Sequence, residues 1–184
     1  MMSLAGIIIL SPILILIAAL IKIDSKGPIF FCQKRIGINK SHFMIYKFRT
    51  MRIDTPKDTP THMLKDPGQY ITKMGQFLRR TSLDELPQLF NILRGDMSVI
   101  GPRPALWNQD DLIAERDKYN ANDIRPGLSG WAQINGRDEL PILVKAQLDG
   151  HYREKMGLLF DCRILVMTVV TAIVGKGVSE GAGG

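Results

Sequence analysis

The centre of the chain contains two arginines followed closely by two adjacent carboxylates, in the stretch Arg79-Arg80-Thr81-Ser82-Leu83-Asp84-Glu85-Leu86-Pro87. From here onward, apolar residues recur at the spacing of one helix face: Leu86, Leu89, Phe90 and Leu93. We therefore predict a helix that begins near the acidic pair and ends at Gly95, since glycine commonly terminates helices.

The acidic pair admits a structural and a chemical interpretation. With Asp84 as N-cap, Pro87 falls in the first helical turn, whereas with Ser82 as N-cap, Glu85 completes a capping box. In the chemical interpretation, the upstream arginines keep a carboxylate ionised, as a nucleophile must be. Two adjacent acids could also hold Mg²⁺ between the protein and phosphate oxygens.

An apolar segment opens the chain, and residues 4–23 carry no charge before Lys22. Twenty residues suffice for a helix to cross a bilayer. Pro12 lacks the N–H that would bond the carbonyl of Ile8, so we predict a kink, and the Ser11 hydroxyl could satisfy the freed carbonyl. A kinked spanning helix and a re-entrant helix that returns to the same face both remain open.

Composition narrows the possible partners. The 184 residues suggest one domain, 45% of them are apolar, and the net charge is +6. A basic chain attracts polyanions, but zinc-finger, RNP and basic-zipper spacings do not occur in it, so we predict no nucleic-acid partner and favour anionic lipid or phosphorylated ligands. We expect Cys32 and Cys162 to be buried small apolar residues outside any disulfide framework.

The middle of the chain predicts a small basic hairpin. Strands at 29–33 and 43–48 would be joined by a turn at 37–40. Lys47 and Arg49 alternate onto one face, which makes them ligand candidates. Further on, Gly101-Pro102-Arg103-Pro104 is a rigid turn that presents one arginine for a phosphate fork.

Other segments are assigned more coarsely. We predict a loop at 53–69, a short helix at 72–78, a solvated helix at 109–119, a ligand loop at 125–137 and a loose tail at 179–184. Trp131, within the ligand loop, is expected to be a packing anchor. Residues 164–174 are uncharged but too few to cross a bilayer, so an interfacial or core helix is expected there.

The order and spacing of these motifs resemble those of the bacterial sugar transferases, the monotopic phosphoglycosyl transferases, and among them the capsule-synthesis members. The resemblance runs from about residue 6 to residue 178. It is carried by Ser11-Pro12, Lys47-Phe48-Arg49-Thr50-Met51, the stretch 78–89, Gly95-Asp96-Met97-Ser98, Gly101-Pro102-Arg103-Pro104 and the segment 125–137.

The resemblance implies an α+β fold with a re-entrant helix broken at Ser11-Pro12, a small β-hairpin and several helices, some of them amphipathic and interfacial. Residues 1–26 would form the membrane helix. Residues 27–184 would form a catalytic domain on the cytoplasmic face of the bacterial inner membrane, with a C-terminal interfacial helix.

The resemblance also implies a two-step reaction. Asp84 would attack the sugar-linked phosphate of a UDP-sugar, UMP would leave, and undecaprenyl phosphate would take the sugar phosphate from the aspartyl intermediate. Glu85 would be the second acid and, with Asp84, a ligand of Mg²⁺. The predicted substrate-binding residues are Lys47, Arg49, Arg80, Arg103, Arg125, Gln133 and Arg137.

Three features depart from the family pattern. Members usually begin with a basic stretch and an aspartate, whereas this chain begins Met1-Met2-Ser3, as a truncated member would. Gly157 stands where the family often has serine, and the loop from Ile53 to Gln69 is this chain's own. The sugar is expected to be an N-acetylated hexose, with an unmodified hexose as the alternative.

Two other function classes were weighed. A non-catalytic or truncated membrane-surface binding module accounts for the charge and the apolar ends, but not for the acid pair beside arginines. A nucleotidyl transferase is weaker still, because the sequence has no Gly-rich phosphate loop.

Overall fold

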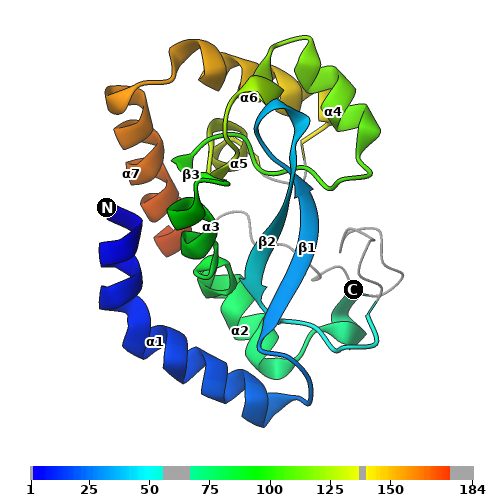
Figure 1. The fold of residues 1–184 in the computed structure, drawn as a ribbon, viewed down its shortest axis with the longest axis vertical. Helices are drawn as coiled ribbons and strands as arrows, with labels where there is room; N and C mark the ends of the chain where they lie inside the picture. Colours follow the sequence, from blue (N-terminus) through cyan, green and yellow to red (C-terminus); the bar gives the residue numbers. More distant parts are fainter. Residues whose placement is uncertain (1, 56–66, 137–139, 175–184) are drawn as a thin grey trace. The chain divides into compact units, whose positions relative to one another are not determined.

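The computed structural model describes residues 2–55, 67–136 and 140–174, which form helices and short strands (Figure 1). The strands are β1 (Phe30–Ile36), β2 (His42–Phe48), β3 (Ser98–Ile100) and β4 (Gly127–Ser129). The α-helices are α1 (Met2–Asp24), α2 (Lys73–Thr81), α3 (Gln88–Arg94), α4 (Asp110–Asp117), α5 (Trp131–Ile134), α6 (Ile142–Lys155) and α7 (Leu158–Val174). The predicted mixture of helices with a small hairpin is confirmed.

Two compact units divide the chain. The first takes the described parts of residues 1–33 and 46–90, and the second takes the described parts of 34–45 and 91–177. The first unit contains α1, α2 and the acidic pair, and the second contains the β3–β4 pair and helices α4 to α7. The core of each unit is described separately below.

Helix α1 runs through Pro12 without ending, but Figure 1 shows that it bends along its length. The Ser11 hydroxyl donates to the carbonyl of Ile8 at 2.8 Å. This is the carbonyl that Pro12 leaves without its helical donor. The predicted kink and its polar compensation are confirmed. By length and apolar composition α1 is long enough to cross a membrane.

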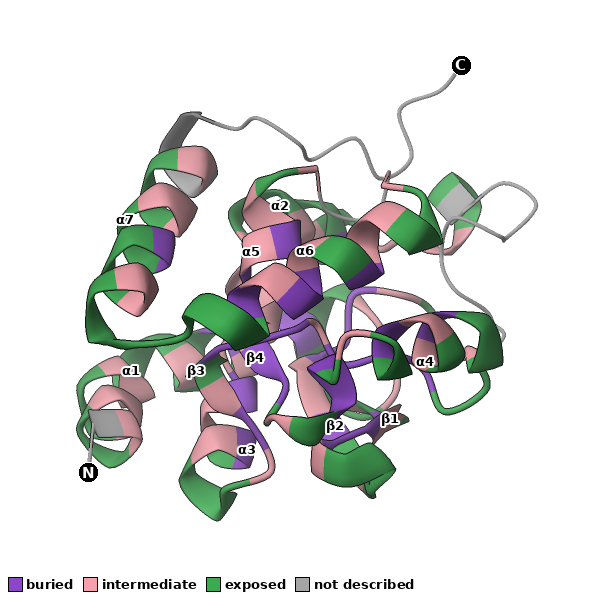
Figure 2. Cartoon of the chain, turned by 90° about the horizontal axis from the view of Figure 1, so that it is seen from above, coloured by how far each residue is buried: buried purple, intermediate pink, exposed green. Residues whose placement is uncertain are grey.

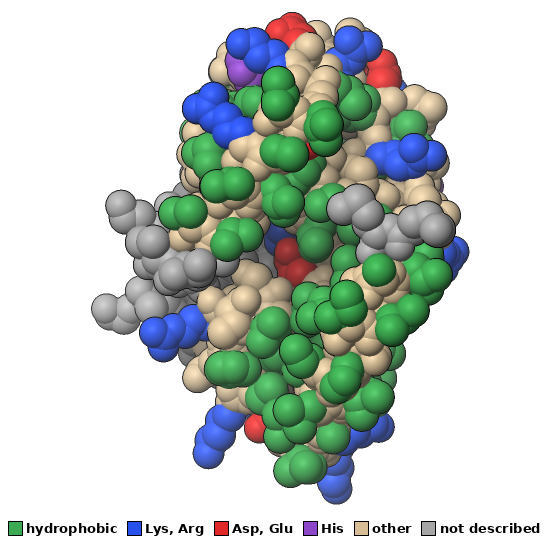
Figure 3. Space-filling view, turned by 90° about the vertical axis from the view of Figure 1, so that its left-hand side faces the viewer, with side chains coloured by type: hydrophobic (Ala, Val, Ile, Leu, Met, Phe, Trp, Pro, Cys, Tyr) green, Lys and Arg blue, Asp and Glu red, His purple; other side chains and the backbone are tan. Residues whose placement is uncertain are grey.

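Only one side of α1 packs against the first unit. Ile17 and Ile21 are buried with Phe48 and Leu78 in the core of that unit. Many other apolar side chains of the helix are exposed, among them Leu4, Ile8, Ile9, Ile13, Ile15, Leu16, Leu20 and Ile23. The hydrophobic surface that results is visible in Figure 3.

The hairpin turn is a single 3₁₀ turn (Ile38–Lys40), where Asn39 and Lys40 have positive φ values of 52° and 59°. The sequence predicted this turn and both strands, although each strand differs at its ends from the predicted range. Ser41 closes the turn by donating its hydroxyl to the carbonyl of Ile38 at 2.7 Å.

Neither Asp84 nor Ser82 is the N-cap of α3, so both predicted N-caps are wrong. Ser82 is the C-terminal cap of α2, with a left-handed φ of 57° and no side-chain cap bond, and Asp84 lies inside a 3₁₀ turn (Leu83–Glu85). The helix α3 begins only after Pro87. The reason is that proline cannot donate to the carbonyl of Leu83, which accepts from the Leu86 N–H instead.

Polar rather than apolar residues occupy the buried face of α3. Gln88 and Asn91 are 2% and 0% exposed, whereas Phe90 and Leu93 are exposed. The predicted apolar stripe therefore exists, but much of it faces outward. Gly95, with a φ of 84°, ends the helix as predicted.

In the second unit, β3 and β4 pair in parallel, with Ser98 opposite Gly127 and Ile100 opposite Ser129. The sequence did not predict this pair. A Cβ on Gly127 would lie 2.1 Å from the Gly101 nitrogen, so only glycine allows the two chains to approach this closely. Figure 2 shows β4 among the buried segments.

A buried ion pair joins two helices of the second unit. The Arg116 guanidinium on α4 donates twice to the Asp149 carboxylate on α6, at 2.8 and 2.6 Å. Leu112 and Arg116 are both buried, so the predicted helix is present but is not simply solvated. Burial raises the pKa of Asp149, and the charge of Arg116 opposes that rise.

Helix α7 and the turn before it complete the second unit. Ile164 is buried with Ile100 and Tyr152, and Trp131 packs against this core, as predicted. Leu158 and Leu159 are 81% and 88% exposed. The predicted burial of the cysteines is wrong, because Cys32 and Cys162 are both exposed. The tail at 179–184 and most of the 53–69 loop lie outside the described residues.

Candidate active site

Residues 47–50, at the end of β2 and just after it, have side chains that contact different partners in the first unit. The Lys47 ammonium contacts the Glu85 carboxylate, with 2.7 Å between Nζ and Oε1. The two side chains are only 17% and 18% exposed. A pair with so little solvent around it interacts more strongly than a surface ion pair.

The neighbours of Lys47 hold this strand end in place. Phe48 is buried in the core and stacks on Phe30, with 5.6 Å between the ring centroids. Thr50 receives a hydrogen bond from Arg79 Nε at 2.9 Å on its hydroxyl and one from the Thr72 N–H at 3.0 Å on its carbonyl. These contacts fix α2, and hence the acidic turn after it, relative to Lys47.

Glycine permits the contact between α2 and the strand end. A Cβ on Gly75 would lie 2.0 Å from the carbonyl oxygen of Thr50, closer than any real contact. Gly75 therefore lets the backbones of the helix and strand touch. The same closeness sets the position of the helix that leads into Asp84 and Glu85.

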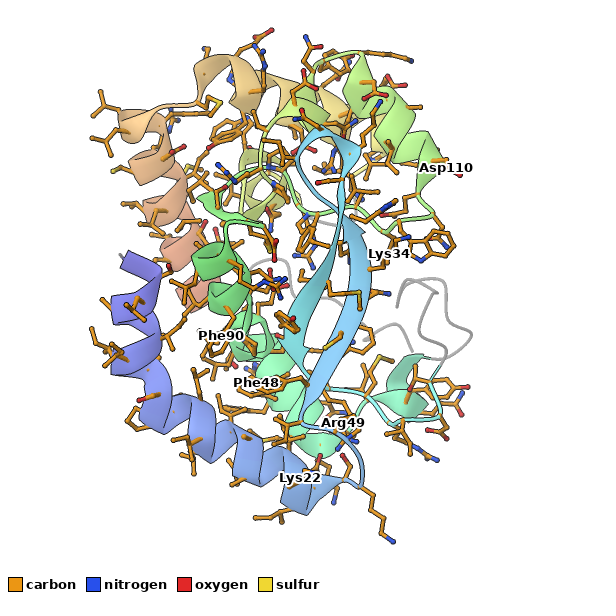
Figure 4. All side chains as sticks on the ribbon, viewed as in Figure 1. Lys22, Lys34, Phe48, Arg49, Phe90 and Asp110 are labelled. Carbon is orange, nitrogen blue, oxygen red and sulfur yellow. The ribbon has the colours of Figure 1, made fainter. Side chains whose placement is uncertain are left out.

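Arg49 points away from the acidic pair, toward the end of α1. Its guanidinium donates to the carbonyl of Ser25 at 2.7 Å, to the Ser25 hydroxyl at 2.9 Å, and to the carbonyl of Lys26. Figure 4 labels this arginine at the end of β2. Burial lowers its pKa, and the nearby Asp24 opposes that shift. The structure thus gives Arg49 a role in holding the α1–β1 connection, and its predicted substrate contact stays a prediction.

Asp84 lies in a tight turn between two helices. The turn is built from i to i+3 bonds, from the Glu85 N–H to the Ser82 carbonyl and from the Leu86 N–H to the Leu83 carbonyl. Its side chain is half-buried and already has interaction partners in the structure. A carboxylate in this position is held by the backbone but still reachable from solvent.

The two arginines upstream differ in their environments. Arg80, the predicted phosphate ligand, is exposed at the end of α2. Arg79 is half-buried and bonded to Thr50. The sequence did not separate the two, because nothing in a pair of adjacent arginines says which one faces the fold.

The acidic pair offers few metal ligands on its own. Within the described ranges, no group of three or more metal-ligating side chains occurs. Asp84 and Glu85 supply two carboxylates, and Lys47 takes one oxygen of Glu85. Mg²⁺ commonly binds through one or two carboxylates together with substrate phosphates and water, so this donor set fits a magnesium ion that arrives with a diphosphate.

Three of the other predicted residues lie in the second unit. Arg103 is half-buried in the turn after β3, and the carbonyls on either side of it are both engaged. The Pro102 carbonyl accepts from the Gly127 N–H at 2.9 Å, and the Pro104 carbonyl accepts from Arg35 at 3.0 Å. The predicted rigid turn is present, anchored at both prolines.

Arg125 and Gln133 flank β4. Arg125 is exposed and donates through Nε to the carbonyl of Gly95 at 2.9 Å, while Gln133 donates to the carbonyl of Leu128 at 3.1 Å. Between them the predicted ligand loop contains a buried strand and a short helix, because its glycines permit close packing against β3. Arg137 lies outside the described residues.

Gln88 and Asn91 were not predicted as site residues. Asn91 Nδ2 donates to the carbonyl of Met44 at 2.8 Å and lies 3.3 Å from an oxygen of Asp96. Gln88 Nε2 is buried and has no hydrogen-bond partner among the described residues. The available signal was a pair of amides three residues apart in a helix whose other residues before Arg94 are apolar.

Together these features define a mixed helix–sheet protein with an exposed apolar N-terminal helix and a cation-paired acidic turn. The model of the bacterial sugar transferase family matches residues 1–175, so the chain belongs to that family.

Its curated relatives include proteins of several organisms. The chain is 37% identical over 170 residues to the sugar transferase EpsL of Bacillus subtilis (strain 168), covering 92% of this chain and 82% of EpsL. It is 37% identical over 184 residues to the UDP-glucose:undecaprenyl-phosphate glucose-1-phosphate transferase of Escherichia coli (strain K12), covering 92% of this chain and 38% of that protein.

A third relative is the UDP-N-acetylgalactosamine-undecaprenyl-phosphate N-acetylgalactosaminephosphotransferase of Aeromonas hydrophila. The identity is 35% over 175 residues, covering 91% of this chain and 40% of that protein. The chain therefore spans less than half the length of the two relatives that are named for a sugar substrate.

Proposed function

We propose that this chain is a phosphoglycosyl transferase that moves a sugar 1-phosphate from a UDP-sugar to undecaprenyl phosphate and releases UMP. The observation that carries the proposal is the acidic turn, where Asp84 stands half-buried next to a Glu85 that is neutralised by Lys47. Membership of the family and the names of the Escherichia coli and Aeromonas relatives support the reaction class. The product would begin capsule, exopolysaccharide or other glycoconjugate synthesis.

In the first step, an oxygen of the Asp84 carboxylate attacks the phosphorus that carries the sugar. A bond forms between that oxygen and phosphorus, and the bond from phosphorus to the bridging oxygen of UMP breaks. UMP leaves with the electron pair, so no proton is needed. In the second step, an oxygen of undecaprenyl phosphate attacks the same phosphorus, and Asp84 is released as a carboxylate.

The attack joins two anions, so cations must surround the reacting group. From their match to the family's motifs, Arg80, Arg103, Arg125, Arg137 and Gln133 are proposed to bind phosphates and the nucleotide sugar. Lys47 balances the negative charge of Glu85 through their contact. Asp84 and Glu85 would hold Mg²⁺, which supplies charge neutralisation on the diphosphate when it is bound.

The acceptor requires a membrane location. Extracting a prenyl chain from lipid costs about 0.8 kcal/mol per CH₂, so the transfer must take place near the headgroups. The exposed apolar residues of α1 suit burial in lipid. We propose that α1 is re-entrant, with both ends on the cytoplasmic face of the bacterial inner membrane, and that α7 lies at the interface.

The donor sugar is proposed to be an N-acetylated hexose. The Aeromonas relative is named for such a sugar, while the Escherichia coli relative is named for glucose. A UMP-release screen across UDP-sugars, with Mg²⁺ and polyprenyl phosphate, separates these possibilities.

The central test replaces the proposed nucleophile. Asp84→Asn keeps the size of the side chain but removes the anionic oxygen, so UMP release should fall to background while the protein still folds and binds membrane. With wild type, the donor half-reaction alone should leave a sugar-phosphate adduct on Asp84, detectable by peptide mass spectrometry. Normal activity of the Asn variant would refute the assignment.

The alternative is a non-catalytic membrane-surface module. It predicts no UMP release from any UDP-sugar by the wild-type chain, even though the chain binds vesicles that contain anionic lipid. The acidic turn argues against it, because a module that binds anionic lipid gains nothing from two carboxylates held next to the binding cations.

A further inference from the structure

Gln88 carries a hydrogen-bond donor that the fold buries without a partner. The side chain is 2% exposed, and Nε2 has no acceptor among the residues that the structure describes. Burying an amide N–H without a hydrogen bond destabilises a fold, and such groups are rare in native proteins. A donor of this kind therefore calls for an explanation at its site.

Gln88 follows the acidic pair by four and three residues, where the 3₁₀ turn at residues 83–85 leads into α3. The turns from residue 82 to residue 90 are tight, with i to i+3 bonds that include the Leu89 N–H to the Leu86 carbonyl and the Phe90 N–H to the Pro87 carbonyl. Side chains three residues apart share one face of a 3₁₀ turn, and side chains three or four apart share one face of an α-helix. Side chains in helices also lean toward the preceding turn. Asp84 and Glu85 are the residues four and three positions before Gln88.

Of these two acids, Asp84 is the better acceptor for the Gln88 amide. One oxygen of Glu85 is already held by Lys47 at 2.7 Å. Asp84 is half-buried and engaged in contacts that do not include Gln88 Nε2. To bond the buried amide, the Asp84 carboxylate has to exchange one of these contacts, and the inference places that exchange at the step in which Asp84 attacks phosphorus.

We propose that Gln88 is a positioning residue for Asp84: its buried amide donates a hydrogen bond to the non-attacking oxygen of the Asp84 carboxylate as the other oxygen attacks phosphorus. In the acyl phosphate that forms, the bonded oxygen becomes the carbonyl oxygen. The inference rests on the proposed function, since it concerns the orientation of the same nucleophile.

The energetics favour this arrangement. A donor left unpaired in the resting protein raises the free energy of that state, and its hydrogen bond is gained only as the reaction proceeds. An interaction stronger in the transition state than in the ground state increases kcat without improving substrate binding.

The test compares Gln88→Met and Gln88→Leu with wild type and Asp84→Asn, using full-length protein in nanodiscs. Both apolar variants fill similar volume and remove the unpaired donor. We expect kcat for UMP release to fall about 10-fold to 100-fold, with KM for the UDP-sugar unchanged. The melting temperature should be unchanged or higher, because no resting hydrogen bond is lost.

Asn91→Leu is the matched control for stability. Asn91 is a fully buried amide on the same helix, but its donors are paired with Met44 and Asp96. Its replacement should lower the melting temperature, which shows that the assay detects the loss of a buried, bonded amide.

The remaining outcomes separate the hypotheses. If wild type releases UMP, Asp84→Asn does not, and both Gln88 variants keep kcat within twofold of wild type, the inference is overturned and the proposed function stands. If both Gln88 variants lose stability together with activity, Gln88 is structural and the inference is also overturned. If wild type releases no UMP from any UDP-sugar, the proposed function fails and the inference fails with it.

Discussion

At the scale of single residues, the Lys47–Glu85 ion pair balances one of the two negative charges of the acidic turn. Two neighbouring carboxylates repel each other, and a like charge nearby raises the pKa of an acid. Lys47 removes part of that repulsion by pairing with Glu85 at 2.7 Å in a place with little solvent. The proposed nucleophilic role of Asp84 requires an anionic carboxylate, and this pairing lowers the electrostatic cost of having one next to a second acid.

A double-mutant cycle tests the strength of this pair. Lys47→Met leaves the poorly solvated carboxylate of Glu85 without its cation, and Glu85→Gln removes the charge. We expect a coupling energy of about 0.5–3 kcal/mol in the free energy of unfolding, measured by denaturant titration in detergent.

The exposed pair of Lys40 and Asp117 provides the comparison for that cycle. Its side chains are 52% and 43% exposed, so the corresponding cycle should give about 0–1 kcal/mol. Equal coupling energies at the two pairs would show that the low exposure of the Lys47 pair has no energetic consequence.

At the scale of secondary-structure elements, α1 is a bent helix in which a side chain supplies the hydrogen bond that the backbone lacks. The Ser11 hydroxyl satisfies the carbonyl that Pro12 leaves open, so the bend leaves that group bonded even in lipid. Arg49 fixes the other end of the connection by binding the backbone of Ser25 and Lys26. The helix is thus bent in its middle and held where it enters the hairpin.

Labelling of single cysteines tests the topology of α1. In a background without Cys32 and Cys162, cysteines introduced by Ser3→Cys and Lys26→Cys should both resist an impermeant maleimide in intact cells and react after lysis, as a re-entrant helix predicts. Adding Pro12→Ala restores a backbone donor for Ile8 and should favour a spanning helix. Labelling of Ser3→Cys in intact cells, without the proline change, would contradict the re-entrant proposal.

The elements that the sequence predicted well are those defined by local chemistry. Pro12, the turn at residues 38–40 and the stop at Gly95 each follow from the backbone preferences of one or two residues. The capping of α3 was predicted wrongly because Pro87 shifts the start of the helix past both candidate caps. The parallel pairing of β3 with β4 was missed because strands of three residues carry too little pattern, and their contact depends on glycines far apart in sequence.

At the scale of the whole molecule, the helix proposed to bind the membrane and a buried ion pair that supports the fold lie in different units. The exposed apolar helix and the acidic turn belong to the first unit, and the buried Arg116–Asp149 pair belongs to the second. The sequence indicated the candidate acids and arginines, but it could not show that Arg49 binds backbone or that Arg116 is buried, since both depend on tertiary contacts.

Asp149→Asn should destabilise the protein without releasing it from membranes. The Arg116 guanidinium would keep its charge in a site where both side chains are 6% exposed or less, without the anion that balances it. Removing one partner of a buried ion pair costs about 3–5 kcal/mol, so the variant should melt at a clearly lower temperature and lose activity at 37 °C. Because α1 is part of the first unit, the protein should still sediment with membranes.

Asp54→Asn is the control: it breaks an ion pair whose side chains are 60% and 52% exposed, and it should change stability by less than about 1 kcal/mol. Equal melting temperatures for the two variants, or release of Asp149→Asn from the membrane, would contradict this separation of roles.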